Sequence, residues 1–470
     1  MRVHPQGSAS MYKRVPSKDS TNSVDLENDS EVLQDGMVQE STDPPLRLSL
    51  PHVLVASIVS FLFGYHLGVV NEPLESIARD LGFSGNSLAE GLVVSTCLGG
   101  AFLGSLFSGL IADGVGRRRS FQLCALPMII GACCSATSNN LTGMLIGRFL
   151  VGIGLGIGPP VASLYITEVS PPSVRGTYGS FIQISTCLGL MGALLIGIPV
   201  KSIQGWWRMC FWLSTIPSTV LALAMVFCAE SPHWLYKIGN GRVLKSDRGD
   251  ENDTVRISEL LYGRHCRVVF IGSTLFALQQ LSGINAVFYF SSTVFRSAGV
   301  SSNLANAFVG IVNLLGSIIA LLLMDKLGRK VLLLWSFFGM AMSTVFQVIA
   351  AGLFASTSGA LYLSVLGMLM FVFCFAIGVG PVPGLLLSEI FPNRIRAKAM
   401  AFCMSVHWVF NFMVGLLFLR LLEVMGPQLL YSMLGTFCLV RGGVCKTERD
   451  GNQRKNASRN RDSSSTTTIE

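Results

Sequence analysis

Long apolar runs dominate this chain from Pro51 onward. Every run but the last is close to the roughly twenty residues that a helix needs to cross the hydrocarbon core of a bilayer. Only 13% of the 470 residues are charged, whereas about a quarter are charged in a soluble globular protein. A backbone in lipid must satisfy its own hydrogen bonds, and runs of this length do so as helices. We therefore expect an all-α membrane protein.

The apolar runs fall into two sets of six, separated by a charged segment. The first set covers 54–70, 88–111, 121–136, 141–166, 181–200 and 206–227. The second set covers 268–290, 305–324, 331–353, 361–387, 400–422 and 429–440. This layout predicts a polar N-terminal tail (1–50), a six-helix bundle (51–229), a cytoplasmic central loop (230–267), a second helix bundle (268–440) and a C-terminal tail (441–470). We expect both tails to be disordered.

The N-terminal tail carries eight acidic residues. Low hydrophobicity together with many charges is typical of a disordered segment. An organelle transit peptide is usually rich in Arg and poor in acidic residues, so this composition argues against one. We also expect no signal peptide before the first apolar run.

The distribution of charge and cysteine excludes several classes of protein. The formal net charge is +8, but the cations gather in short connections such as 116–119 and 326–330. This pattern is typical of loops on the cytoplasmic side of a membrane and argues against nucleic-acid binding. The twelve cysteines have no metal-ligand or redox spacing, so we interpret them as packing residues.

Motifs for catalysis are also missing from the sequence. We find no metal-binding His pair, nucleophile motif or Walker loop, so we expect neither an enzyme nor a cofactor. The glycine-rich stretch at 152–158 lies inside an apolar run, where small residues let helices approach closely. We expect a monomer whose surroundings are the lipid bilayer.

Two charged motifs occur twice, once in each set of apolar runs. An Asp-x-x-Gly-Arg motif follows the second run and recurs 212 residues later, after the eighth. A Glu seven residues before an Arg follows the fourth run and recurs 221 residues later, after the tenth. The charged members are Asp113, Arg117, Glu168 and Arg175 in the first half, and Asp325, Arg329, Glu389 and Arg396 in the second. One duplication explains both spacings.

These repeated charges suggest a gate. A charge at a helix end near lipid is costly unless it is paired, so pairs among these residues can hold one arrangement of the two halves and release another. The alternative is that they only anchor the topology. Gly380, Pro381 and Pro383 interrupt the tenth run. Because proline removes a backbone donor and bends a helix, we expect a second gating element there, with a static kink as the alternative.

The repeated motifs resemble those of the sugar porter family of the major facilitator superfamily, over residues 51–439. Within it, the chain most resembles the plant plastidic glucose transporter group, through VVNEPLESIA at 69–78, FALQQLSGINAVFYFSSTVF at 276–295 and SDRGDE at 246–251. The resemblance implies two six-helix bundles in parallel repeat, a central sugar site, alternating access and a plastid envelope, with another endomembrane as the alternative. The chain departs from the family pattern at Gly384, which weakens the case for an aromatic lid. It departs again at Ala229 and His233, which weakens the case for a charge network through Glu230.

A neutral sugar needs side chains that both donate and accept hydrogen bonds, together with a flat apolar face. The seventh run contains three amides in one stretch of seven residues: Gln279, Gln280 and Asn285. A helix break at Gly283 would let Gln280 and Asn285 face one cavity. These three predict a sugar site.

Single amides in other runs are weaker candidates. Gln183 and Asn313 could bond between helices instead, and the family resemblance favours sugar contact for both. Trp408 and Asn411 share a helix face, and His407 is placed to join them. Stacking of a sugar on Trp408 is implied by the resemblance.

We expect facilitated transport of a hexose such as glucose by alternating access, as a uniport. Proton-coupled relatives carry Asp where this chain has His66, and a neutral imidazole carries a coupled proton poorly near pH 7. The alternatives are a proton symporter and a sugar sensor that binds without transport. The short C-terminal tail argues against the sensor.

The last apolar run is short. Its twelve residues, 429–440, span about 18 Å as a helix, whereas a bilayer core is about 30 Å thick. Arg441 and Lys446 follow, and the Pro-Glu-Thr-Lys-Gly motif of the family is absent. We therefore expect a truncated last helix and impaired transport.

Overall fold

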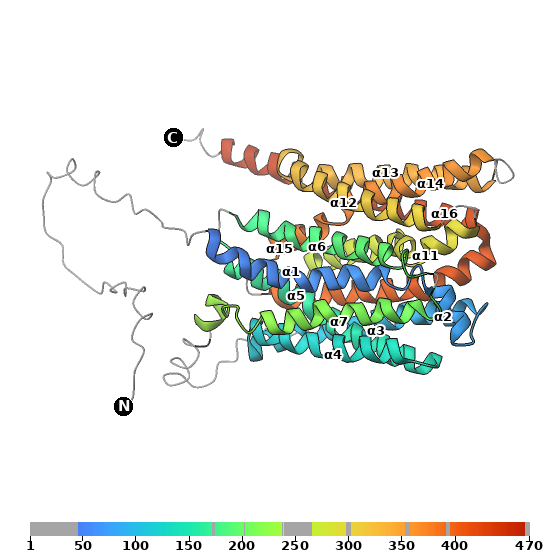
Figure 1. Ribbon diagram of the computed structural model, residues 1–470. Helices are drawn as coiled ribbons and strands as arrows, with labels where there is room; N and C mark the ends of the chain where they lie inside the picture. Colours follow the sequence, from blue (N-terminus) through green and yellow to red (C-terminus); the bar gives the residue numbers. More distant parts are fainter. Residues whose placement is uncertain are drawn as a thin grey trace, which may run out of the picture. The chain divides into compact units, whose positions relative to one another are not determined.

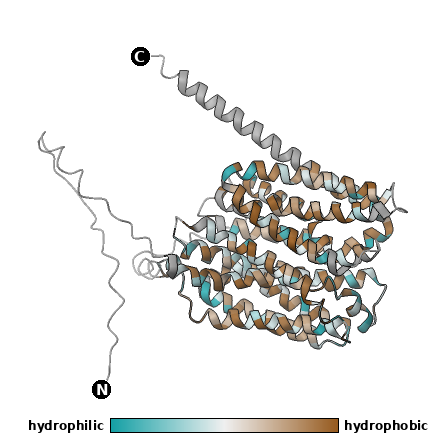
Figure 2. Ribbon diagram, turned by 45° about the horizontal axis from the view of Figure 1, so that its top comes forward, coloured by the Kyte–Doolittle hydropathy of each residue, from teal (hydrophilic) through white to brown (hydrophobic). Residues whose placement is uncertain are grey.

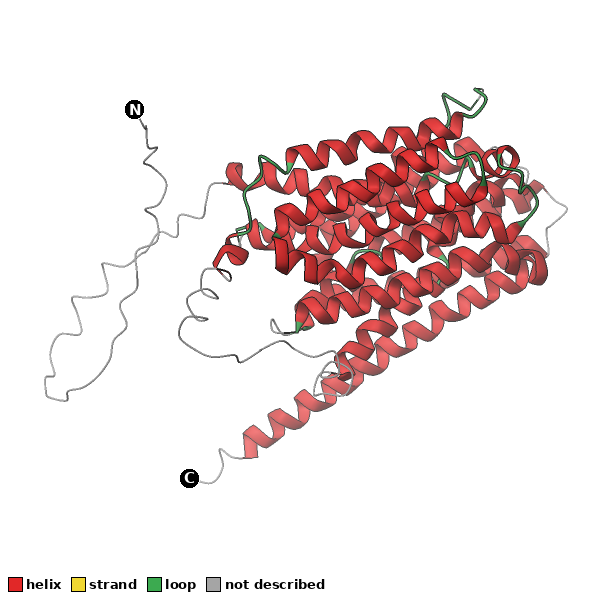
Figure 3. Ribbon diagram, turned by 90° about the horizontal axis from the view of Figure 1, so that it is seen from below, coloured by secondary structure: helices red, strands yellow, loops and turns green. Residues whose placement is uncertain are grey.

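The computed structural model describes residues 46–171, 174–201, 203–236, 238, 266–297, 302–352, 358–391 and 395–465. All regular secondary structure within these ranges is helical (Figure 3). Residues from Pro44 onward form one compact unit. Its two sets of helices run along a common direction (Figure 1), as expected for a bundle that crosses a bilayer.

Helices follow the apolar runs closely. The first half contains α1 (Leu46–Gly68), α2 (Leu74–Asp80), α3 (Ser87–Val115), α4 (Arg117–Thr137), α5 (Leu141–Val169), α6 (Arg175–Ile196) and α7 (Trp206–Ala224). The second half contains α10 (Cys266–Leu281), α11 (Ile284–Ser297), α12 (Ser302–Leu327), α13 (Arg329–Gly352), α14 (Ser358–Cys374), η1 (Phe375–Val379), α15 (Val382–Ile390) and α16 (Arg396–Ser465).

The internal repeat relates the two largest interfaces between the halves. One pairs α3 with α16, and the other pairs α6 with α12. The Asp-x-x-Gly-Arg motifs follow α3 and α12, while the Arg residues of the second motif begin α6 and α16. In each interface, therefore, a helix that ends in the Asp-x-x-Gly-Arg motif packs against a helix of the other half that begins at the Arg of the Glu–Arg motif.

Small residues permit the closest helix crossings. A Cβ atom on Gly152 would lie 2.0 Å from the Cys97 carbonyl oxygen of α3, and one on Gly156 would lie 2.1 Å from the Ala101 oxygen. No larger residue fits at these two positions without moving a backbone. The interpretation of the stretch 152–158 as a packing surface is confirmed.

The outer surface of the bundle is apolar. Hydrophobic residues cover much of the ribbon (Figure 2), and side chains such as Leu110, Phe270 and Trp335 are about 70% exposed. Exposed apolar patches of this extent are expected where lipid replaces water as the solvent. Ten helices of the described part are long and apolar enough to cross a membrane.

The described part has ten candidate membrane helices, whereas twelve apolar runs were predicted, and there are two reasons for the difference. The tenth candidate, Lys398–Leu439, joins two predicted runs, which are separated by a kink at Gly426 with φ 75°. The helix α7 is not among the ten, because Arg208 and several hydroxyl side chains lower its hydropathy.

The end of the chain differs from the expectation of a disordered tail. After Gly426, α16 continues as helix to Ser465, although the membrane-compatible stretch ends at Leu439. Extending an existing helix costs far less than nucleating a new one, so a polar continuation can remain helical. The apolar part is therefore short, whereas the helix itself is not.

Candidate functional site

The predicted break at Gly283 is present. The helix α10 ends at Leu281 and α11 begins at Ile284, with Gly283 at φ 85°. This left-handed conformation favours glycine. Across the break, the Asn285 amide donates to the Gln280 side-chain oxygen at 2.5 Å, and Gln280 Nε2 lies 2.9 Å from Nδ1 of His407 on α16. Gln280 and Asn285 therefore share one buried polar cluster.

Gln279 connects this cluster to the proline-interrupted segment. Its Nε2 donates to the carbonyl oxygen of Val379 at 2.7 Å, at the end of η1. The η1 segment is a π-helix in which the Gly380 amide donates to the Phe375 carbonyl oxygen. Pro381 caps the next helix and Pro383 lies in its first turn, so the backbone is irregular at the position of the predicted gating element.

Trp408 and Asn411 lie on α16, the helix that also carries His407. The Tyr289 hydroxyl donates to Asn411 Oδ1 at 3.1 Å. The Trp408 ring makes edge contacts with His407 and with Phe63 of α1, at centroid distances of 5.1 and 5.8 Å. Trp408 therefore contacts both halves of the protein, and Tyr289 is a site residue that the sequence did not reveal.

Gln183 and Asn313 meet at a cysteine on the interface between α6 and α12. Asn313 Nδ2 lies 3.4 Å from the Cys187 sulfur, and Gln183 Nε2 lies 3.6 Å from it. The Ser317 hydroxyl is 3.1 Å from the same sulfur. Sulfur is a weak hydrogen-bond acceptor, so both amides keep much of their capacity for a stronger partner.

Several of these side chains have a buried polar atom without a hydrogen-bond partner in the described part. These atoms are Gln279 Oε1, Asn313 Oδ1, Trp408 Nε1 and Asn411 Nδ2. Orphaned polar atoms in a protein interior are rare and costly, and they usually mark a site that something else completes. A polyhydroxyl ligand could satisfy both the donors and the acceptors.

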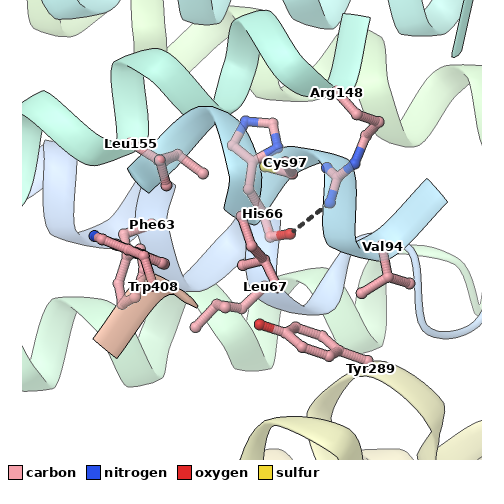
Figure 4. Close-up of a pocket in the computed structure, with 11 residues that line it drawn as sticks. Phe63, His66, Leu67, Val94, Cys97, Arg148, Leu155, Tyr289 and Trp408 are labelled. Atoms are coloured by element: carbon pink, nitrogen blue, oxygen red, sulfur yellow. Dashed lines mark hydrogen bonds between the residues drawn. The ribbon is translucent and has the colours of Figure 1, made fainter. Parts of the chain in front are cut away.

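A small cavity lies between the halves at this level, lined by Phe63 and His66 of α1, Arg148 of α5, Tyr289 and Trp408 among others (Figure 4). It has room for about one water-sized group. A hexose is much larger, so binding at this level requires the two halves to separate locally.

Three first-half members of the repeated motifs, Asp113, Arg117 and Glu168, form an ion-pair network. Arg117 is buried, and its guanidinium donates to both carboxylate oxygens of Glu168 at 2.9 and 3.0 Å and to Asp113 at 3.1 Å. Glu230 accepts the backbone N–H of Arg117 at 2.9 Å, which places a carboxylate at the positive end of α4. Glu230 therefore belongs to this network in spite of its altered sequence context.

The other motif residues are described less completely. The side chains of Arg175, Asp325, Glu389 and Arg396 lie outside the described residues. Arg329 is described and half-buried at the start of α13.

A second polar cluster, which the sequence did not predict, joins the halves at the opposite end of the bundle. Asn71 donates to the Phe288 carbonyl oxygen at 2.8 Å and to the Ser291 hydroxyl at 2.7 Å, and it accepts the Ser292 N–H at 3.0 Å. The Glu72 carboxylate accepts hydrogen bonds from Ser292, Asn306 and Lys201. We name these residues the end latch: Asn71, Glu72, Lys201, Ser291, Ser292 and Asn306.

Comparisons with known proteins agree with this architecture. A family model described as "Sugar (and other) transporter" matches residues 52–445. The chain is 66% identical over 457 residues to "Probable plastidic glucose transporter 2" of Arabidopsis thaliana, covering 92% of this chain and 93% of that relative. "Plastidic glucose transporter 4" of the same plant is 42% identical over 85% of this chain and 78% of its own length.

Solved structures show the same arrangement of helices. The proton:xylose symporter XylE bound to 6-bromo-6-deoxy-D-glucose superposes with a TM-score of 0.73 at 27% identity, over 84% of this chain and 94% of that structure. The match includes both sets of helices, as expected for one shared fold.

Proposed function

This chain belongs to the sugar transporter family of the major facilitator superfamily, and from that premise we propose that it carries glucose across a plastid membrane as a uniporter. Transport of a hexose follows from the family and from the relatives, which are themselves plastidic glucose transporters by name. The preference for glucose, the plastid envelope and the uniport are the proposed parts.

The orphaned polar atoms carry this proposal. Gln279, Asn313, Trp408 and Asn411 each hold a buried atom without a partner in the described part of the chain, and they come from three different helices, α10, α12 and α16. A hexose offers hydroxyl groups that donate and accept, so it complements this mixture of donors and acceptors. The aromatic face of Trp408 suits the apolar face of a pyranose ring.

The proposed gates lie at the two ends of the same bundle. The network around Arg117 lies within the first half, whereas the end latch joins the turn after α1 to α11 of the second half. A state with the end latch closed can expose the sugar site only toward the other end, which is the geometry that alternating access requires. The second-half motif residues are proposed to act as Arg117 and Glu168 do.

Hexose flux into proteoliposomes tests the main function. Radiolabelled glucose is expected to equilibrate across the membrane in the presence of this protein, with a half-saturation concentration that competing hexoses raise. Saturable binding without flux would instead support a sugar sensor.

An imposed pH gradient is expected to leave the final internal glucose concentration equal to the external one. His66 occupies the position where proton-coupled relatives have Asp, and neither of its ring nitrogens has a partner among the described residues. Accumulation of glucose above the external concentration, lost in His66→Asn, would establish proton symport. The likeness to a proton:xylose symporter makes that the second candidate.

Gln280→Ala and Asn285→Ala are each expected to raise the half-saturation concentration about 5- to 100-fold. Each change leaves a sugar hydroxyl unpaired in a desolvated site, at a cost of about 1 to 3 kcal/mol. Gln280→Ala also removes the contact with His407. Gln122→Ala is a matched control, because that amide bonds Ala222 within the first half. Equal half-saturation in all three variants would move the sugar site away from the break at Gly283.

A further inference from the structure

Arg148 on α5 is a buried cation with too few partners. The residue is 2% exposed. Its Nε donates to the Val93 carbonyl oxygen at 3.2 Å, and one terminal nitrogen donates to the His66 carbonyl oxygen at 3.4 Å (Figure 4). The other terminal nitrogen, Nη1, has no partner among the described residues. Two long bonds to neutral carbonyl groups do not compensate a full positive charge removed from water.

No carboxylate of the described residues forms an ion pair with Arg148. The side chains close enough to interact electrostatically with its guanidinium are His66, Cys97 and Tyr289. The centroid of the Phe211 ring lies 6.0 Å from the guanidinium carbon, so one neighbour of the cation is an aromatic ring. Within the described residues, the ion-paired carboxylates belong to the two end networks and to short pairs along single helices.

His66 faces the same region with free capacity. It is 2% exposed, and neither Nδ1 nor Nε2 has a hydrogen-bond partner in the described part. A neutral imidazole carries one N–H donor, so His66 and Arg148 together present at least two donors. Both residues line the small cavity between the halves, on its α1 and α5 side, and this cavity has room for about one water-sized group.

We propose that this cavity binds a small monovalent anion of the halide class, with chloride as the physiological ligand. A water molecule could accept from Arg148 but would leave its charge uncompensated, whereas a chloride ion offsets the charge and accepts from both residues. The cavity is too small for a sugar acid or a sugar phosphate. Tyr289 and Trp408 line both this cavity and the proposed sugar site, whereas the halide contacts are made by Arg148 and His66. Chloride binding is measured without sugar, so it can be tested whether or not glucose is the substrate.

Thermal unfolding of the purified full-length protein tests the proposal. Sodium gluconate is replaced stepwise by sodium chloride at constant ionic strength, and the midpoint temperature is recorded. A ligand that binds only the folded state stabilises it by mass action. We expect the midpoint to rise with the logarithm of the chloride concentration above the dissociation constant, by about 2 °C at a tenfold excess. A midpoint that does not depend on chloride would overturn the proposal, as would a rise of the same size in a protein without Arg148.

Two variants separate this site from general salt effects. Arg148→Met removes the charge and should abolish the chloride response. His66→Asp places a carboxylate beside Arg148, and should abolish the response while preserving the fold through an internal ion pair. Should Arg148→Met not fold, His66→Asp alone decides the question, because an undiminished chloride response in a folded His66→Asp protein contradicts the site.

Iodide gives a direct reading of occupancy, because it quenches tryptophan fluorescence and Trp408 lines the same cavity. Wild-type protein is expected to show a saturable quenching component that chloride displaces. Trp408→Phe should lose that component and keep the linear quenching of the other tryptophans. Linear quenching alone in wild-type protein would place no halide at this cavity.

Discussion

Arg117→Leu is expected to destabilise the protein by about 3 to 5 kcal/mol and to abolish hexose flux. The guanidinium holds two carboxylates, and the Glu168 side chain is only 12% exposed. Removal of the cation leaves Glu168 as an uncompensated charge away from water, which is the costly way to break a partly buried ion pair. Thermal unfolding in detergent measures the stability, and proteoliposome flux measures transport.

Arg119→Leu is the matched control for this experiment. Arg119 lies two residues further along the same motif and is exposed, so its replacement removes an equal charge from the same loop. Surface charges of this kind contribute about 0 to 1 kcal/mol. Equal midpoint temperatures for the two variants would show that the network around Arg117 anchors topology and does not hold the structure.

Glu72→Gln is expected to open the end latch. The Glu72 residue is 3% exposed, and its carboxylate accepts from Ser292 and Asn306 of the second half and pairs with Lys201. Hydrogen bonds to a charged group are worth about 1.5 to 3 kcal/mol, so loss of the charge should shift the balance between closed and open states about 10- to 150-fold. Hydrogen exchange of peptides covering α11 should accelerate, because the Ser292 amide is part of the latch.

Glu75→Gln controls for the loss of one carboxylate near the same turn. Glu75 is about half exposed and pairs with Arg79 within α2 at 2.9 Å. Its replacement should leave both α11 exchange and flux unchanged. Unchanged exchange in Glu72→Gln as well would mean that Asn71 alone closes this end.

Local sequence patterns were sufficient to predict the helices and part of the candidate site. Apolar runs of bilayer length predicted the helices, since lipid leaves the backbone few alternatives. Glycine at position 283, between two amides, predicted the break that lets Gln280 contact Asn285. The repeated motifs predicted a two-fold internal relation, and the paired interfaces of α3 with α16 and α6 with α12 follow it.

Contacts between distant residues could not be predicted in this way. Asn71 reaches Phe288 across 217 positions of the chain, and His66 lies beside Arg148 across 82. Periodicity assigns each of these residues to a helix but not to a partner, because the partner depends on how the two halves pack. The sequence by itself therefore determined the membrane fold, its repeat and the amides of the seventh helix. Only the tertiary structure decided the end latch, the orphaned polar atoms and the unpaired charge of Arg148, since each arises where separate helices bury one another.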